Sequence, residues 1–226
     1  MTKINSIVAG GCFPTPNQPS LPSPTLPRPE PLPLPTPKPG GLDRFLTPAR
    51  SQQLANTQGN QLDSIQKGLK SGSITEQEAT KLLGQQAKIA EATASASADG
   101  VITAKEAATL RGLQTKAGLD TFLATHNRDR SAPGDAVAKE QAAQLGRIAQ
   151  GVRSGSLTGA EANTLLTDQA DIAQTVADAK SDGEVDFIEE QMVNIRQDAA
   201  SFEIGLEKRD GEKAPHAKRL NFPVLF

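Results

Sequence analysis

One segment of the chain occurs twice, and this repeat constrains the fold more than any other feature. Residues 61–126 align with residues 144–206 at an offset of 83, and about two in five positions are identical between 61–110 and their counterparts. Such similarity within one chain indicates a duplicated supersecondary unit. We therefore expect the same local structure in both copies, here called repeat 1 and repeat 2.

Each copy contains three stretches whose apolar residues recur at the spacing of one helix face. In repeat 1 these residues are Leu62, Ile65 and Leu69, then Leu82, Leu83, Ala87, Ala90 and Ala94, then Leu110, Leu113, Ala117 and Phe122. In repeat 2 they are Leu145, Ile148 and Val152, then Leu165, Leu166, Ala170, Ala173 and Ala177, then Met192, Ile195, Phe202 and Leu206. The pattern predicts three amphipathic helices in each repeat, with these faces turned to the core.

The joints between the predicted helices resemble one another. A glycine stands just past a helix end at Gly72, Gly100, Gly155 and Gly183, where a left-handed backbone is most easily adopted by glycine. Three residues later comes an N-cap side chain, and three further on a glutamate: Thr75 and Glu78, Thr103 and Glu106, Thr158 and Glu161, Asp186 and Glu189. These pairs are typical of capping boxes and predict helix–turn–helix junctions.

Composition favours the same fold. The chain has neither Trp nor Tyr, and Ala and Leu, which suit close helix packing, are frequent in its middle, whereas sheets favour aromatic and β-branched residues. We predict an all-α protein of two tandem three-helix repeats, at residues 50–127 and 136–210, packed on each other. Residues 1–45 are expected to form a disordered Pro-rich arm, and residues 211–226 a tail.

The arm and the tail each leave two interpretations open. Prolines recur every second or third residue from Phe13 to Gly41; because proline fixes φ and lacks an amide donor, we expect an extended spacer without a core. The alternative is that its PxxP spacings dock on a partner's aromatic groove. The apolar tail sequence KRLNFPVLF either folds back onto the helices or docks on a partner.

Charge and cysteine usage bound the partners and the compartment. A net charge of -2 argues against nucleic acid, whose binding needs a concentrated basic face. Cys12, the one cysteine, follows small residues as in a bacterial lipoprotein signal, but the apolar run 7–9 is too short for export unless translation starts upstream. No stretch approaches the ~20 apolar residues of a membrane span. We therefore expect a soluble protein and leave its compartment open.

The four turns resemble the second half of an EF-hand calcium loop. In that loop glycine occupies position 6, an aliphatic residue position 8 and glutamate position 12. All four turns carry the pattern, with Ile74, Ile102, Leu157 and Val185 at position 8. The resemblance is to degenerate EF-hand-like tandem helical repeats of bacterial type. It implies EF-hand-like helix–turn–helix junctions and, where oxygen ligands are present, Ca²⁺ as the ion bound.

Residues 178–189 fit the calcium loop best. The ligands that the resemblance implies there are Asp178, Asp182, the carbonyl of Glu184, Asp186 and Glu189. Lys180 departs from the pattern, because it puts a cation at position 3, where calcium needs an oxygen ligand. A weaker candidate set lies at 95–106, namely Ser95, Ser97, Asp99, Thr103 and Glu106. The turns at 67–78 and 150–161 have no carboxylate at positions 1, 3 and 5, so capping alone explains them.

No paired nucleophile and base, nucleotide loop or histidine ligand pair occurs in the sequence. We therefore predict a protein that is not an enzyme and has no resident cofactor. Two hypotheses about its function follow. In the first, it is a structural or protein-interaction module that contacts a protein partner through its helical surface, its Pro-rich arm or its tail. In the second, it binds Ca²⁺ weakly through residues 178–189, with residues 95–106 as a second site.

Overall fold

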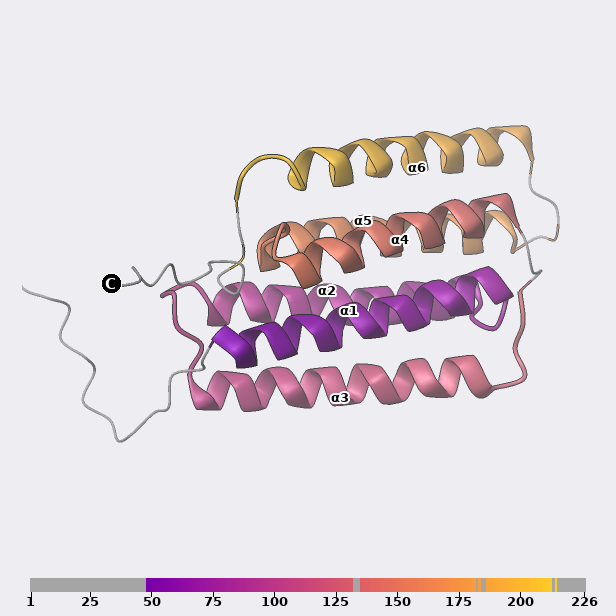
Figure 1. Cartoon of the computed structure of the whole chain (residues 1–226). Helices are drawn as coiled ribbons and strands as arrows, with labels where there is room; N and C mark the ends of the chain where they lie inside the picture. The colour runs from indigo at the N-terminus through magenta and orange to yellow at the C-terminus, as the bar shows by residue number, and fades with distance from the viewer. Residues whose placement is uncertain (1–47, 132–134, 182, 184–185, 213, 215–226) are drawn as a thin grey trace, which may run out of the picture. The chain divides into compact units, whose positions relative to one another are not determined.

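The computed structural model describes residues 48–131, 135–181, 183, 186–212 and 214, and within them the chain forms six α-helices and no strand (Figure 1). The helices are α1 (Pro48–Ser71), α2 (Glu76–Ala96), α3 (Ala104–His126), α4 (Ala136–Ser154), α5 (Gly159–Ala179) and α6 (Phe187–Glu207). The predicted all-α fold is confirmed. The predicted arm and the residues from 215 onward lie outside the described residues.

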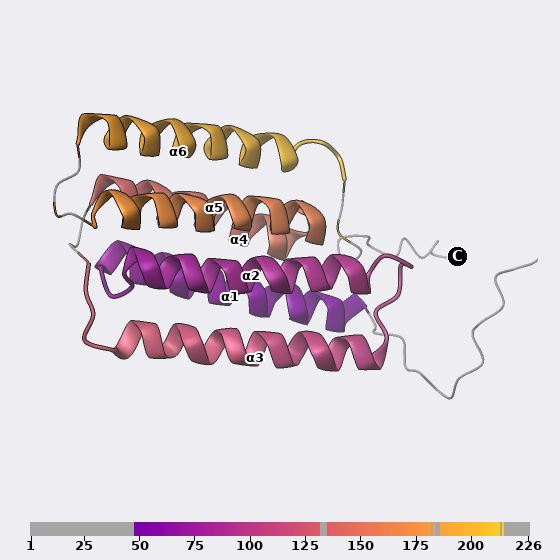
Figure 2. The same ribbon diagram turned by 180° about the vertical axis from the view of Figure 1, so that it is seen from behind.

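The two repeats pack on each other through two helices from each repeat, here called the inner helices. Helix α1 contacts α4 and α2 contacts α5, while α3 packs on α1 and α2, and α6 packs on α4 and α5 (Figures 1 and 2). Each repeat thus supplies two inner helices and one outer helix. The outer helices α3 and α6 lie on opposite sides of the four inner ones.

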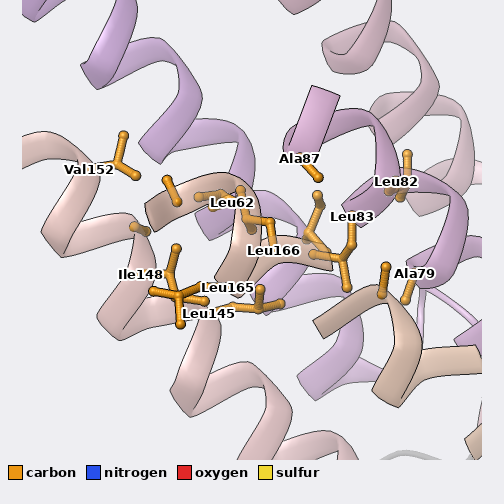
Figure 3. Close-up of a cluster of buried hydrophobic side chains, with 14 of the residues drawn as sticks. Leu62, Ala79, Leu82, Leu83, Ala87, Leu145, Ile148, Val152, Leu165 and Leu166 are labelled. Carbon is orange, nitrogen blue, oxygen red and sulfur yellow. The ribbon is translucent and has the colours of Figure 1, made fainter. Parts of the chain in front are cut away.

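The main core lies between the inner helices of the two repeats. Leucine and isoleucine side chains from α1, α2, α4 and α5 meet there, as Figure 3 shows for Leu62, Leu83, Ile148 and Leu166. These four side chains are fully buried, and each such burial stabilises the fold by about 1.5–3 kcal/mol. The predicted inner faces of α1, α2, α4 and α5 are therefore the buried ones, with Ala94 only partly covered.

All four predicted junctions have the predicted chemistry. Capping boxes stand at the start of α2, α3, α5 and α6, and the glycine before each has a positive φ between 69° and 88°. The turn also explains two glycines inside helices. A Cβ added to Gly68 would overlap Ile74, and one added to Gly151 would overlap Leu157. The aliphatic residue of the turn thus packs directly on the backbone of the preceding helix.

Glutamines, all buried except the partly exposed Gln61, connect the three helices of each repeat in the same way. In repeat 1 the Nε2 bonds run from Gln58 to the Gln86 carbonyl, from Gln61 to the Gln114 carbonyl, from Gln86 to Gln61 Oε1 and from Gln114 to the Leu54 carbonyl, over 2.6–3.1 Å. In repeat 2 they run from Gln141 to the Gln169 carbonyl, from Gln144 to the Gln197 carbonyl, from Gln169 to Gln144 Oε1 and from Gln197 to the Val137 carbonyl, over 2.7–2.9 Å. Because a buried amide without a partner is costly, these bonds hold each outer helix in one register.

The predicted core face was wrong for α6 and for one residue of α3. Met192, Ile195, Phe202 and Leu206 of α6 are exposed, as is Phe122 of α3. The buried residues of α6 are instead Val193, Gln197, Ala200 and Ile204. Helix α6 carries apolar residues on two opposite faces, and packing buries the face with Gln197 and the small Ala200, because this face completes the glutamine network and allows close approach.

Candidate functional site

The residues of the best calcium-loop candidate are largely engaged in local hydrogen bonds. Asp178 lies in the last turn of α5, where its Oδ1 accepts a bond from Gln174 Nε2 (2.7 Å). The Asp186 side chain accepts from the Glu189 amide, and the Glu189 carboxylate accepts from the Asp186 amide, in the capping box of α6. Asp182 and Glu184 lie outside the described residues. Calcium binding by this loop stays a prediction.

Lys180, at position 3 of that loop, belongs to a different interaction. Its Nζ donates to Glu76 Oε1 and to Asp135 Oδ2, both at 2.6 Å. Burial opposes its charged form, but the bonds to these carboxylates prevail and raise the pKa of Lys180 above its ordinary value. The lysine thus joins the end of α5 to the starts of α2 and α4.

The second loop candidate is likewise occupied by local bonds. Ser97 donates from its hydroxyl to the carbonyl of Thr93 (2.8 Å), and Asp99 Oδ1 accepts from the Val101 amide (3.0 Å). Thr103 and Glu106 form the capping box of α3, and Ser95 lies in the last turn of α2. Calcium binding by residues 95–106 likewise stays a prediction.

Three carboxylates lie close together between α5 and the end of α6. No sequence motif groups them. Carboxylate oxygens of Glu161, Glu207 and Asp210 lie within 4.8 Å of one another, the one group of at least three metal-ligand side chains among the described residues. Glu161 Oε1 is buried and has no hydrogen-bond partner within that part of the chain. Burial raises the pKa of Glu161 above its ordinary value, against bonds from Thr158, and the neighbouring Asp210 adds to the rise.

A further pair of carboxylates lies between α5 and α6, on the side of repeat 2 that is hereafter called the α5–α6 edge. Burial, followed by the neighbouring Glu203 on α6, raises the pKa of Asp168 on α5 to about 6. Two carboxylates so placed cannot both ionise without repulsion. The α5–α6 edge therefore carries more negative charge than its surroundings neutralise.

At the equivalent edge of repeat 1, amides donate to the two carboxylates, and Lys116 also forms an ion pair with Asp120 (2.9 Å). Subtracting 83 takes Glu161 and Asp210 to Glu78 and Asn127, and Asn127 Nδ2 donates to Glu78. It takes Asp168 and Glu203 to Gln85 and Asp120, and Gln85 Nε2 donates to Asp120 Oδ2 (2.6 Å). Both amides of repeat 1 are carboxylates in repeat 2. Comparing the two copies position by position would have revealed this from the sequence.

The outer face of α6 is an exposed apolar stripe. It consists of Ile188, Met192, Ile195, Ala199, Phe202 and Leu206, hereafter the α6 stripe, and all six residues are exposed. Ile195 is 66% and Phe202 67% exposed, against 3% for Val193 on the opposite face. The alternating four- and three-residue spacing keeps the stripe in line along the whole helix. A helix that is apolar on two opposite faces is typical of one covered on both sides.

The fold itself does not require the α6 stripe. The first four positions correspond to Lys105, Thr109, Gly112 and Lys116 on α3, which packs in the equivalent place. Only Leu119 and Leu123, at the end of α3, match the apolar character of Phe202 and Leu206. Sequence reasoning had noticed these α6 residues but assigned them to the core.

Two more findings concern membrane-spanning helices and similarity to known proteins. Among the helices in the described residues, none combines the length and the apolar character needed to cross a membrane. No protein-family model, curated protein or solved structure matches the chain.

Proposed function

We propose that the protein is a non-enzymatic interaction module whose α6 stripe docks an apolar, basic segment of a protein partner. The exposure of the stripe carries this proposal. Large apolar side chains are exposed along the whole of α6, whereas the first four equivalent positions on α3 are Lys105, Thr109, Gly112 and Lys116. Contiguous apolar surface of this kind marks protein-interaction sites.

The charges beside the stripe select the partner. Helix α6 carries the carboxylates Glu189, Glu190, Asp198, Glu203 and Glu207 and a single basic residue, Arg196. An acidic rim favours a partner with Lys or Arg beside its apolar residues and disfavours an acidic one. A second copy of α6 would bring like charges together, so a basic segment is the better fit.

The direct test uses a synthetic amphipathic peptide of Leu and Lys, labelled for fluorescence anisotropy, and its analogue of Leu and Glu. We expect the Leu–Lys peptide to bind the full chain more tightly than the Leu–Glu analogue. Ile195→Lys and Phe202→Lys should each weaken binding by about tenfold or more, since each removes about 1.5–3 kcal/mol of apolar burial.

The control variant is Leu119→Lys on α3, at the position equivalent to Phe202. It changes the net charge equally and also removes an exposed leucine, so its effect on binding should be small. Equal affinity for both peptides, or equal losses in all three variants, would show that α6 is not the docking surface.

Calcium binding through residues 178–189 remains the alternative hypothesis. Calorimetric titration of Ca²⁺ into the parent chain and into Asp182→Ala separates the two functions. Heat in the parent that disappears in the variant would support the loop, whereas an absence of heat at millimolar Ca²⁺ would end the hypothesis.

A further inference from the structure

We propose that residues 218–226, KRLNFPVLF, bind the α6 stripe within the same chain and so compete with an external partner. This inference rests on the proposed docking function of the stripe, and it names the segment that covers the stripe when no partner is bound. Residues 215–226 lie outside the described residues, so the argument uses their sequence and the point from which they start.

The chain after α6 is held at the end of the molecule where α4 and α6 end. The Ala214 amide donates to the Gly155 carbonyl (3.0 Å), just past the end of α4. At the same end, Lys208 Nζ donates to Gln150 Oε1 on α4 (3.3 Å). These two bonds hold the chain after α6 against repeat 2. Residue 215 therefore leaves from the end of the molecule where Phe202 and Leu206 expose their side chains.

The segment is long enough to run back along the helix. Twelve residues follow Ala214, and an extended chain covers at most about 3.3–3.6 Å per residue, or roughly 40 Å. Helix α6 has 21 residues, which span roughly 31 Å at 1.5 Å per residue. Part of this length is used between Ala214, bonded past the end of α4, and the outer face of α6, so the apolar part of the segment, from Leu220 to Phe226, can reach the stripe residues nearest the end of α6.

The charges and the backbone of the segment suit this surface. Lys218 and Arg219 precede the apolar residues, and the end of α6 nearest to them carries Glu203 and Glu207. Pro223 prevents a continuous helix, so the segment would lie in extended form. Its apolar residues Leu220, Phe222, Val224, Leu225 and Phe226 are then available for contact with the stripe.

Disulfide trapping in the full chain tests the proposal. In a Cys12→Ser background, Ala199→Cys places a thiol in the middle of the stripe and Asn221→Cys places one in the segment. The control pairs Asn221→Cys with Lys116→Cys, the exposed α3 position equivalent to Ala199. We expect an intramolecular disulfide to form at least about tenfold faster with Ala199→Cys, because docking raises the local concentration of the second thiol.

Charge reversal sharpens the test. Lys218→Glu with Arg219→Glu should reduce the Ala199→Cys trapping rate to that of the control. The same double substitution, in the chain without added cysteines, should tighten binding of the Leu–Lys peptide, because it removes the competitor. Circular dichroism of each variant checks that the helices are retained.

The outcomes separate the two proposals. Equal trapping at positions 199 and 116 overturns the intramolecular contact, and the docking function then depends on the peptide result alone. Disulfide-linked dimers in place of the intramolecular product would make a second copy the source of the bound segment and equally overturn it. Fast trapping at position 199 without any peptide binding, even after charge reversal, would leave a self-contact and reject the docking function.

Discussion

The α2–α3 edge of repeat 1 and the α5–α6 edge of repeat 2 are equivalent in backbone and different in chemistry. In repeat 1 an amide donates to a carboxylate at both positions, Asn127 to Glu78 and Gln85 to Asp120. In repeat 2 carboxylates face carboxylates, and the pKa of Asp168 is raised to about 6. The glutamine bonds behind both edges are the same. The core therefore keeps the two outer helices alike, while their exposed sides have diverged.

The outer faces of α3 and α6 also differ in their side chains, although the two helices pack in equivalent places. The positions of the α6 stripe are free of packing constraints, because α3 fills them largely with polar residues and still packs in the equivalent place. Packing within the chain does not explain exposed apolar side chains at these positions, and binding of a partner is the explanation that we propose. This contrast is why the proposed docking function is assigned to repeat 2.

The largest expected effect comes from removing a glutamine that both repeats share. Gln144 is fully buried, donates to the Gln197 carbonyl and accepts from Gln169. Gln144→Ala leaves both partners without a bond and should lower the free energy of unfolding by about 2–4 kcal/mol in urea denaturation. Its counterpart Gln61 is partly exposed, so water can replace it and Gln61→Ala should cost about 1–2 kcal/mol. Equal costs would contradict the difference in burial.

A smaller effect is expected where α2 and α5 approach most closely. A Cβ added to Gly159 would lie 2.7 Å from the Ala94 amide nitrogen and 2.9 Å from the Ala90 carbonyl oxygen. Backbone atoms cannot move aside as a side chain can, so Gly159→Ala should destabilise the protein by about 1–3 kcal/mol. The equivalent residue in repeat 1 is Glu76, so Glu76→Ala tests the loss of its bonds from Lys180 and Ser131 without a close approach of backbones. Thermal unfolding of both variants makes the comparison, and an unchanged melting temperature in Gly159→Ala would refute the close approach.

Exchanging the residues of the α5–α6 edge for those of the α2–α3 edge should change the free energy of unfolding by about 1 kcal/mol at neutral pH, because Asp168 is partly exposed and solvent screens its repulsion with Glu203. Asp168→Gln copies Gln85 and should stabilise repeat 2. Gln85→Asp copies the carboxylate pair and should destabilise repeat 1. Chemical denaturation of both variants beside the parent measures the two changes, and the same sign in both would contradict the proposed origin of the difference.

The increase in the free energy of unfolding that we expect from Asp168→Gln should depend on pH. Folding raises the pKa of Asp168 from 3.8 to about 6, so between these values the folded protein binds more protons than the unfolded chain. The contribution of this group to the free energy of unfolding therefore falls as pH rises through the window. The gain from Asp168→Gln is fully present above pH 6 and disappears toward pH 3.8. A gain that is constant with pH would mean that the substitution acts through packing.

The smallest expected effect on stability is on the α6 stripe. In a chain that ends at Ala214, Ile195→Lys should change the free energy of unfolding by no more than about 0.5 kcal/mol, because the side chain is then in water. In the full chain the loss should be larger, because we propose that residues 218–226 cover the stripe. Val193→Ala, on the buried face of the same helix, should cost about 0.5–1.5 kcal/mol. Urea denaturation of the two variants compares the faces directly. A large loss from Ile195→Lys in the full chain would mean that the stripe is covered in the free protein, in agreement with the self-contact proposed for residues 218–226.

The sequence predicted the junctions more reliably than the surfaces. Gly72 and Thr75, like their counterparts, act through neighbours within a few residues, so their roles follow from local spacing. Four residues of the α6 stripe, Met192, Ile195, Phe202 and Leu206, are predicted in the core, because the spacing of apolar residues identifies a helix face but not what covers it. The carboxylate pairs escaped notice because Asp168 and Glu203 are far apart in the chain.

By itself, the sequence determined six helices, their ends and the burial of the four inner faces, because capping, glycine conformation and helical periodicity act within a few residues. Only the tertiary structure decided which side of α6 is buried and which carboxylates face each other. Those outcomes depend on contacts between α6 and the distant α4 and α5. There the Gln197 amide and the small Ala200 fit the available space, and the larger Ile195 and Phe202 remain in water.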